Sequence, residues 1–329
     1  MESMQVIKLK ERENQLEHWL SASLGLNSFI LQPLAGDASF RRYFRVQVDK
    51  YSFVVMDAPP GEDCHPFIAV AKALRKMQLN TPEIIEADLT QGFLLLTDFG
   101  DLTYLRALNA DNADLYYQRA LKALSVLQTC TQVPGHIVPP FTREWMWREW
   151  HWHQEWFLEK LLGLPPAPDS LEEVYSLLVE SAATQPQVFM HRDYHSANLM
   201  VLPDAVGLLD FQDAFIGPLT YDLASLLRDC YIDWPKEKVN QWLLDYWRMN
   251  QALAIEKEDL LRCFDWMSVQ RHLKALFTFA RKQVRDQQAH YLRHVPRTLS
   301  YILQVTSEYP ELASLHQYYR DKVIPACTR

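Results

Sequence analysis

The sequence has few glycines, no long apolar run and no cysteine motif, and each absence argues against a class of protein. Nine glycines in 329 residues disfavour a glycine-rich dinucleotide-binding fold. No stretch reaches the roughly 18 apolar residues of a membrane span, so we expect no membrane association. The cysteines are scattered and lack zinc or redox spacing; they are Cys64, Cys130, Cys230, Cys263 and Cys327. Because the first 20 residues are too charged for a signal peptide and unpaired thiols suit a reducing compartment, we expect a cytoplasmic protein.

A basic excess of the kind that suits nucleic acid is also absent. Lys and Arg number 33 and Asp and Glu number 41, so the formal net charge is −8. Domains that bind nucleic acid usually present a basic surface, so we expect no nucleic-acid partner, and the sequence implies no obligate protein partner. Hydrophobic residues make up 48% of the chain, which is typical of a folded protein. The length suits one large domain or two lobes.

The hydrophobic pattern changes character near residue 97. Before that point, an amphipathic helix over 5–24 precedes strands over 29–34, 40–48 and 51–56, a helix over 66–78 and a strand over 92–97. The short turns between these strands favour an antiparallel sheet. Beyond it, helices are expected over 101–130, 142–162, 170–184, 219–231, 236–252, 257–289 and 297–318, with extended pieces over 188–190, 198–201 and 206–209. We therefore predict an α+β fold with a small antiparallel-sheet lobe, residues 1–97, and a larger helical lobe, residues 98–329.

The strongest chemical signal lies in 189–213, which reads FMHRDYHSANLMVLPDAVGLLDFQD. It contains the pattern H-R-D-x-x-x-x-N, which ends at Asn198, and then an apolar strand that ends at Asp210. Phosphoryl transfer needs one carboxylate to orient the attacking hydroxyl, and a carboxamide and a second carboxylate to hold Mg²⁺ on the nucleotide. Asp193 suits the first task, and Asn198 and Asp210 suit the second. A polar loop between two buried strands is the alternative, but the complete pattern favours catalysis.

These motifs resemble the aminoglycoside phosphotransferase and choline kinase superfamily. The resemblance implies a bilobal protein-kinase-like fold that uses ATP and Mg²⁺, with an alcohol group as the acceptor. The chain has no G-x-G-x-x-G and no A-P-E, and Gln212 stands where D-F-G has its glycine, so a protein substrate is disfavoured. Four segments are similar to the anomeric sugar kinases of cell-wall recycling, namely 36–46, 191–202, 207–231 and 270–281. Those enzymes phosphorylate N-acetylmuramate and N-acetylglucosamine at the C1 hydroxyl, so the resemblance implies an amino-sugar substrate.

The resemblance places the nucleotide against the turn at 36–39 and the junction at 97–99. Backbone N–H groups of a tight turn can cradle phosphate oxygens, and Ser39 adds a hydroxyl. By position, the Thr97 carbonyl and the Phe99 N–H would meet the adenine. Met56 occupies the place of the usual kinase lysine. We therefore expect one of the arginines in 41–45, which include Arg42, to neutralise phosphate charge. Phosphates held by metal and backbone alone, or a nucleotide-binding pseudokinase, are the alternatives.

The remaining candidates support the loop or bind the acceptor. His191 is expected to brace the loop, and the resemblance gives Asp222 the same structural role. Residues 143–157 hold five tryptophans, and Trp152 lies on a helix face that can line an acceptor cleft or pack in the core. A basic set follows downstream and comprises Arg228, Arg271, His272, Lys274 and Arg281. We expect Arg228 and Arg271 to contact an acidic acceptor, although a solvated helix face explains such charges equally well, and an aminoglycoside, choline-like or amino-alcohol acceptor stays open.

Overall fold

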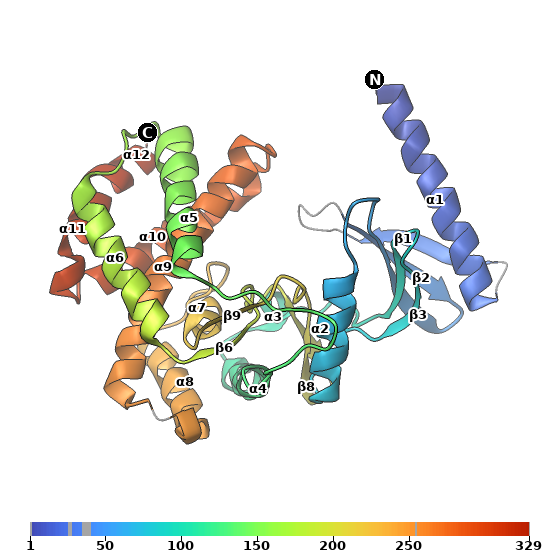
Figure 1. The fold of residues 1–329 in the computed structure, drawn as a ribbon, viewed down its shortest axis with the longest axis horizontal. Coiled ribbons are helices and arrows are strands. Elements are labelled where there is room, and N and C mark those ends of the chain that lie inside the picture. The colour runs from blue at the N-terminus through green and yellow to red at the C-terminus, as the bar shows by residue number, and fades with distance from the viewer. Residues whose placement is uncertain (1, 26–27, 35–40, 254, 329) are drawn as a thin grey trace. The chain divides into compact units, whose positions relative to one another are not determined.

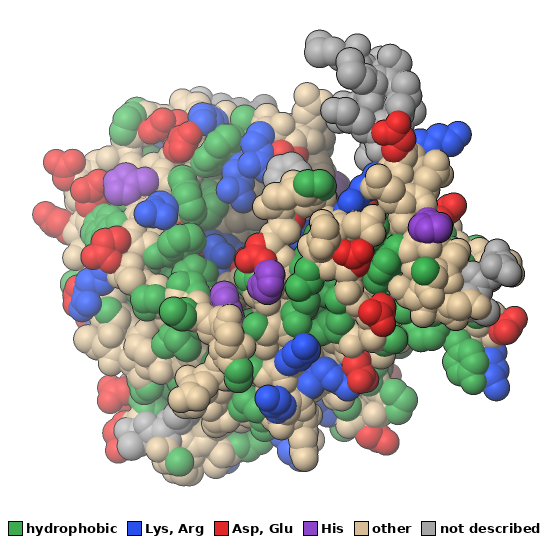
Figure 2. All heavy atoms as spheres, turned by 45° about the vertical axis from the view of Figure 1, so that its right-hand side comes forward, with side chains coloured by type: hydrophobic (Ala, Val, Ile, Leu, Met, Phe, Trp, Pro, Cys, Tyr) green, Lys and Arg blue, Asp and Glu red, His purple; other side chains and the backbone are tan. Residues whose placement is uncertain are grey.

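The computed structural model describes residues 2–25, 28–34, 41–253 and 255–328. The chain forms two compact units (Figure 1). The first comprises Met1–Asp101 and Pro134–His136, and the second comprises Leu102–Val133 and Ile137–Arg329. The predicted lobe boundary lies at residue 97, within four residues of the end of the first segment. Acidic and basic side chains are interspersed on the face shown in Figure 2.

The first unit is built on an antiparallel sheet of order β1-β2-β3-β5-β4. Its strands are β1 (Ile30–Leu34), β2 (Arg42–Val48), β3 (Tyr51–Asp57), β4 (Ile84–Asp88) and β5 (Phe93–Thr97), and its helices are α1 (Glu2–Leu24) and α2 (His65–Lys76). The sequence pattern predicted this sheet apart from β4. That strand is short, largely exposed and without alternation, so it carries no period-2 signal.

Helix α1 covers one face of this sheet. Leu16 and Leu20 are fully buried in a cluster of side chains from three strands, namely Phe44, Val46, Val55, Phe93 and Leu95. Because directly paired residues share a sheet face, Met56, which pairs with Tyr43 and Leu94, lies on the opposite face from this cluster. Met56 is fully buried, so the side chain at the usual lysine position is a core residue.

The second unit is mostly helical. Its α-helices are α3 (Tyr104–Ala107), α4 (Ala113–Leu127), α5 (Arg143–Trp152), α6 (Asp169–Thr184), α7 (Tyr221–Leu227), α8 (Lys236–Met249), α9 (Lys257–Val284), α10 (Val295–Thr306), α11 (Ala313–Tyr318) and α12 (Ile324–Cys327). Segments of 3₁₀- or π-helix cover His153–Leu161, Gln251–Leu253, Ala289–His294, Pro310–Leu312 and Tyr319–Val323. Two short antiparallel pairs complete it, β6 (Gln187–Met190) with β9 (Phe215–Pro218) and β7 (Leu199–Leu202) with β8 (Ala205–Leu208). Among the described residues, no helix combines the length and apolar character that crossing a membrane requires.

Helix α9 is the central element of this unit. It packs against α6, α7, α10 and the π-helical segment His153–Leu161, and α5, α6 and α9–α12 gather into one helical group in Figure 1. A helix with neighbours on all sides is buried all round. Polar side chains on α9, including Gln270, Arg271 and His272, are buried as well. These buried polar groups meet partners from other elements rather than water.

Candidate active site

The loop between β6 and β7 is held by carboxylates of the α7 region. Asp222, in the first turn of α7, accepts the backbone N–H of His191 at 2.6 Å and that of Arg192 at 2.9 Å. Arg192 has φ +79°, a left-handed conformation that a side chain rarely adopts without such support. Burial raises the pKa of Asp222 to about 7, against the effect of the two N–H donors. Asp229 accepts both the N–H and the hydroxyl of Ser196 at 2.8 and 2.5 Å.

The structure brings Asp193, Asn198 and Asp210 together at the end of this loop. The Asn198 amide nitrogen donates to the Asp193 backbone carbonyl at 3.0 Å and lies 3.4 Å from Asp210 Oδ2. Gln212, which replaces the D-F-G glycine, donates to Asp210 Oδ1 at 2.7 Å. Burial and the nearby Asp193 charge raise the pKa of Asp210. Two carboxylates and a carboxamide from one short stretch of chain therefore share one location.

Two cations from α9 face Asp193. Lys274 Nζ lies 2.8 Å from Asp193 Oδ1, and the Arg271 guanidinium lies 3.7 Å from the same oxygen. Burial opposes ionisation of Asp193, but the Lys274 and Arg271 charges hold its pKa well below the ordinary value. Arg271 also donates to Ser225 at 2.9 Å. The predicted Arg271 is thus part of the site, and the Lys274–Asp193 pair is a contact that no local motif announces.

An aromatic wall borders the same loop. The Arg192 guanidinium lies 5.5 Å from the ring centre of Trp145 and 5.1 Å from that of Phe215, and 3.8 Å from the buried Glu149 carboxylate. Trp152 packs on Trp145 at 6.2 Å and on Phe277 of α9 at 5.7 Å. The predicted Trp152 is half-buried in this wall.

Two other predicted residues occupy structural positions. His191 is fully buried and packs edge-on against Tyr194, and burial lowers its pKa to about 4. The imidazole is therefore neutral and buried at the start of the loop, and its bracing role stays a prediction. Arg228 is buried, with its guanidinium bound to Ser268 at 2.6 Å and to Asp265 at 2.5 Å, so its charge is compensated within the protein.

The residues predicted to bind the nucleotide belong to the first unit. Ser39 lies outside the described residues. Arg42 forms ion pairs with Asp57 at 2.6 Å and Glu13 at 3.1 Å. Thr97 exchanges hydrogen bonds with Glu83, through its N–H at 3.0 Å and its hydroxyl at 2.9 Å, and Phe99 is half-buried.

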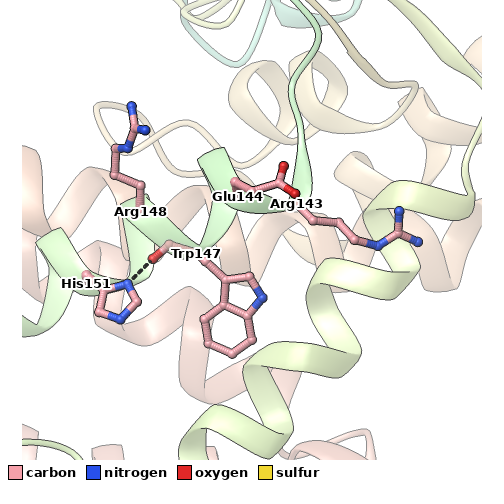
Figure 3. A pocket seen from close by; sticks show the side chains of 5 residues that line it. All are labelled: Arg143, Glu144, Trp147, Arg148 and His151. Atoms are coloured by element: carbon pink, nitrogen blue, oxygen red, sulfur yellow. Dashed lines mark hydrogen bonds between the residues drawn. The ribbon is translucent and has the colours of Figure 1, made fainter.

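A separate hollow opens on the surface of α5. Its lining side chains are Arg143, Glu144, Trp147, Arg148 and His151 (Figure 3). Arg143 is paired with Glu180 of α6 at 2.8 Å, and the His151 ring is hydrogen-bonded to the Trp147 carbonyl at 2.6 Å. The hollow includes none of the residues that contact Asp193, so we do not assign the chemistry to it.

Comparison with known proteins gives consistent matches. Residues 30–263 match the family described as "Phosphotransferase enzyme family". An N-acetylmuramate/N-acetylglucosamine kinase of Pseudomonas putida is 43% identical over 293 residues, which cover 87% of this chain and 86% of that protein. A protein of the same name from Neisseria meningitidis serogroup B is 36% identical over 317 residues, which cover 93% of this chain and 94% of that protein. Among solved structures, a Plasmodium vivax ethanolamine kinase has a TM-score of 0.63 at 15% identity and covers 88% of this chain and 84% of that one. This last likeness confirms the predicted kinase-like α+β fold.

Proposed function

The chain belongs to the phosphotransferase enzyme family, and from this premise we propose that it transfers the γ-phosphoryl group of ATP to an amino sugar. The acceptor is N-acetylmuramate, N-acetylglucosamine or both, and the reacting group is the C1 hydroxyl. The assignment of the acceptor rests on the 43% identity, over 87% of this chain, to a kinase named for these sugars. The corresponding cellular role is peptidoglycan recycling in the cytoplasm.

Asp193 is proposed to orient the acceptor and take its proton. Both α9 cations approach Oδ1 of this carboxylate, so Oδ2 is the oxygen to which the sugar hydroxyl donates. The positive charges keep Asp193 ionised, as an acceptor of a proton must be. As the sugar oxygen bonds to phosphorus, the bond from phosphorus to the bridging oxygen breaks, and the products are a sugar 1-phosphate and ADP. The proton from the hydroxyl passes to Asp193.

Asn198 and Asp210 are the proposed ligands of Mg²⁺. The donor set fits this ion, because Mg²⁺ in kinases is usually bound by one or two carboxylates, with water and substrate phosphates completing its shell. Burial and the Asp193 charge raise the pKa of Asp210, and a bound cation would offset both effects. When bound, the ion supplies positive charge to the phosphates.

The nucleotide contacts at Ser39, Arg42, Thr97 and Phe99 stay proposals from the family resemblance. The Arg42 guanidinium forms ion pairs with Asp57 and Glu13. To contact a phosphate, it would have to bind the phosphate in addition to these carboxylates or in place of one of them. No nucleic-acid, membrane or obligate protein partner is proposed.

The test is an ADP-release assay with ATP and Mg²⁺ across an acceptor panel. The panel holds N-acetylmuramate, N-acetylglucosamine, glucose, kanamycin, choline and no acceptor, and phosphorus NMR identifies the product. We expect turnover on the N-acetyl sugars, a 1-phosphate product, and loss of turnover in Asp193→Asn but not in the matched surface variant Asp204→Asn. Turnover confined to kanamycin or choline would contradict the proposed amino-sugar acceptor. Nucleotide binding without turnover on any acceptor would favour a pseudokinase.

A further inference from the structure

One face of α9 continues from the base to the aromatic wall. Lys274, Phe277 and Arg281 are spaced i, i+3 and i+7, so they lie on one side of the helix. The Lys274 Nζ lies 2.8 Å from the Asp193 Oδ1, and the ring centres of Phe277 and Trp152 are 5.7 Å apart. The same helix side therefore faces both the base and the wall. Arg281 follows Lys274 by about 10 Å along the helix axis, and its side chain leans back toward the N-terminus of the helix.

Arg281 differs from the other cations of this helix in its partners. Its Nε is buried and has no hydrogen-bond partner among the described residues. The nearest carboxylate along the chain, Asp286, is already bound by Arg285 through contacts of 2.6 and 2.9 Å. Burial and the positive charges of Arg285 and Arg192 lower the pKa of Arg281. The Asp286 charge offsets part of this effect, but the buried Nε of Arg281 is still a donor without an acceptor among the described residues, which costs free energy unless a ligand supplies one.

Arg192 reaches the same region from the loop. Its Nε is also buried without a hydrogen-bond partner among the described residues, and its positive charge helps to lower the pKa of Arg281. The Glu149 carboxylate lies 3.8 Å away, beyond hydrogen-bond length. The Trp145 and Phe215 rings on which Arg192 packs limit the directions in which its guanidinium can move. Arg192 from the loop thus packs on the aromatic wall at Trp145, and Arg281 lies on the side of α9 that packs on the same wall through Phe277 and Trp152.

We propose that Arg281 and Arg192 form the subsite that binds the carboxylate of an acidic amino-sugar acceptor, with Trp145 and Trp152 as its wall. Planar guanidinium groups suit a carboxylate because they donate two parallel hydrogen bonds. The subsite recognises a substituent of the sugar, because the reacting hydroxyl lies at Asp193. The inference rests on the proposed function, and it makes Arg281 a determinant of preference for N-acetylmuramate, which carries a carboxylate, over N-acetylglucosamine, which does not.

The test compares kcat/KM for the two sugars at saturating ATP in the wild type, Arg281→Gln and Arg281→Lys. We expect the ratio of N-acetylmuramate to N-acetylglucosamine to fall about 10- to 100-fold in Arg281→Gln, the range for a lost hydrogen bond to a charged group. Arg281→Lys keeps the charge but loses the paired donors, so its ratio should lie between those of the wild type and Arg281→Gln. Arg285→Gln is the matched control, one helical turn further on and outside the subsite, and it should leave the ratio within about twofold, well below the tenfold loss of such a bond.

Three results would overturn the inference. The ratio could stay constant in Arg281→Gln, both sugars could lose activity equally, or the wild type could phosphorylate N-acetylglucosamine alone. A wild type that phosphorylates neither sugar contradicts the proposed function instead, so the two failures are distinguishable. Thermal unfolding followed by circular dichroism checks that each variant is folded.

Discussion

Removing the charge of Asp193 should destabilise the second unit as well as stop the reaction. In Asp193→Asn, Lys274 and Arg271 lose the carboxylate that they approach at 2.8 and 3.7 Å. Breaking a buried ion pair costs about 3–5 kcal/mol because the remaining charge is uncompensated. The Asp193 side chain is 27% exposed and that of Lys274 is 11% exposed, so we expect a loss of about 3 kcal/mol, the lower end of this range.

A double-mutant cycle measures the pair directly. Lys274→Met should also lower the free energy of unfolding, and by less, because Arg271 still faces Asp193. The double variant should lose about 1.5–3 kcal/mol less than the sum of the single losses. Both variants that lack the Asp193 carboxylate should turn over at least about 100-fold more slowly, so the second substitution offsets part of the stability loss but does not restore activity.

Urea unfolding followed by tryptophan fluorescence suits this cycle. Every tryptophan except Trp19 belongs to the second unit, so the signal reports mainly on the unit that contains the pair. ADP release is measured on the same preparations. Additive losses in the double variant, or an Asp193→Asn protein more stable than the wild type, would refute the ion pair as described.

The remaining predictions concern the loop clamp and a buried histidine. Asp222→Asn offers one acceptor for two N–H donors, so the loop should shift and kcat should fall about 10- to 100-fold with native circular dichroism; unchanged kcat would contradict the clamp. His153 is fully buried between the Leu273 carbonyl and the Tyr319 hydroxyl, and burial lowers its pKa to about 3. The unfolded chain therefore binds the proton first as the pH falls below about 6.5, which costs about 1.4 kcal/mol per pH unit. Between pH 7.5 and 5, the wild type should lose about 2 kcal/mol more unfolding free energy than His153→Gln, whereas Tyr319→Phe, which keeps the histidine, should retain the wild-type slope. Parallel curves for the wild type and His153→Gln in urea titrations at several pH values would contradict this.

The part of the site that the sequence predicts is the part that is local in the chain. Asp193, Asn198 and Asp210 fall within 18 residues, and the β7–β8 hairpin between Asn198 and Asp210 returns the chain to Asn198, so that Asp210 emerges beside it. Strand β4 was not predicted because it is largely exposed and lacks alternation, and β9 was not predicted because its four residues pair with β6, on the other side of the β7–β8 hairpin. The predicted helix over 101–130 is two helices, α3 and α4. The Thr103 side chain caps the start of α3, and the Asn109 and Asn112 side chains hydrogen-bond within the turn that separates the two helices.

The functional difference among the downstream cations depends on partners that lie far away in sequence. Arg228 and Arg271 are both buried arginines, yet Asp265 compensates the first and Asp193 meets the second. Arg228 follows α7 and Arg271 lies in the buried middle of α9, and helical segments buried all round have no polar face from which the sequence could separate these two positions. What separates them is the location of each carboxylate after folding, because a cation with a protein partner is already satisfied while one without a partner is available to a ligand. By this criterion Arg281, which no sequence pattern distinguishes from the rest of the basic set, is the member whose charge a substrate anion would satisfy.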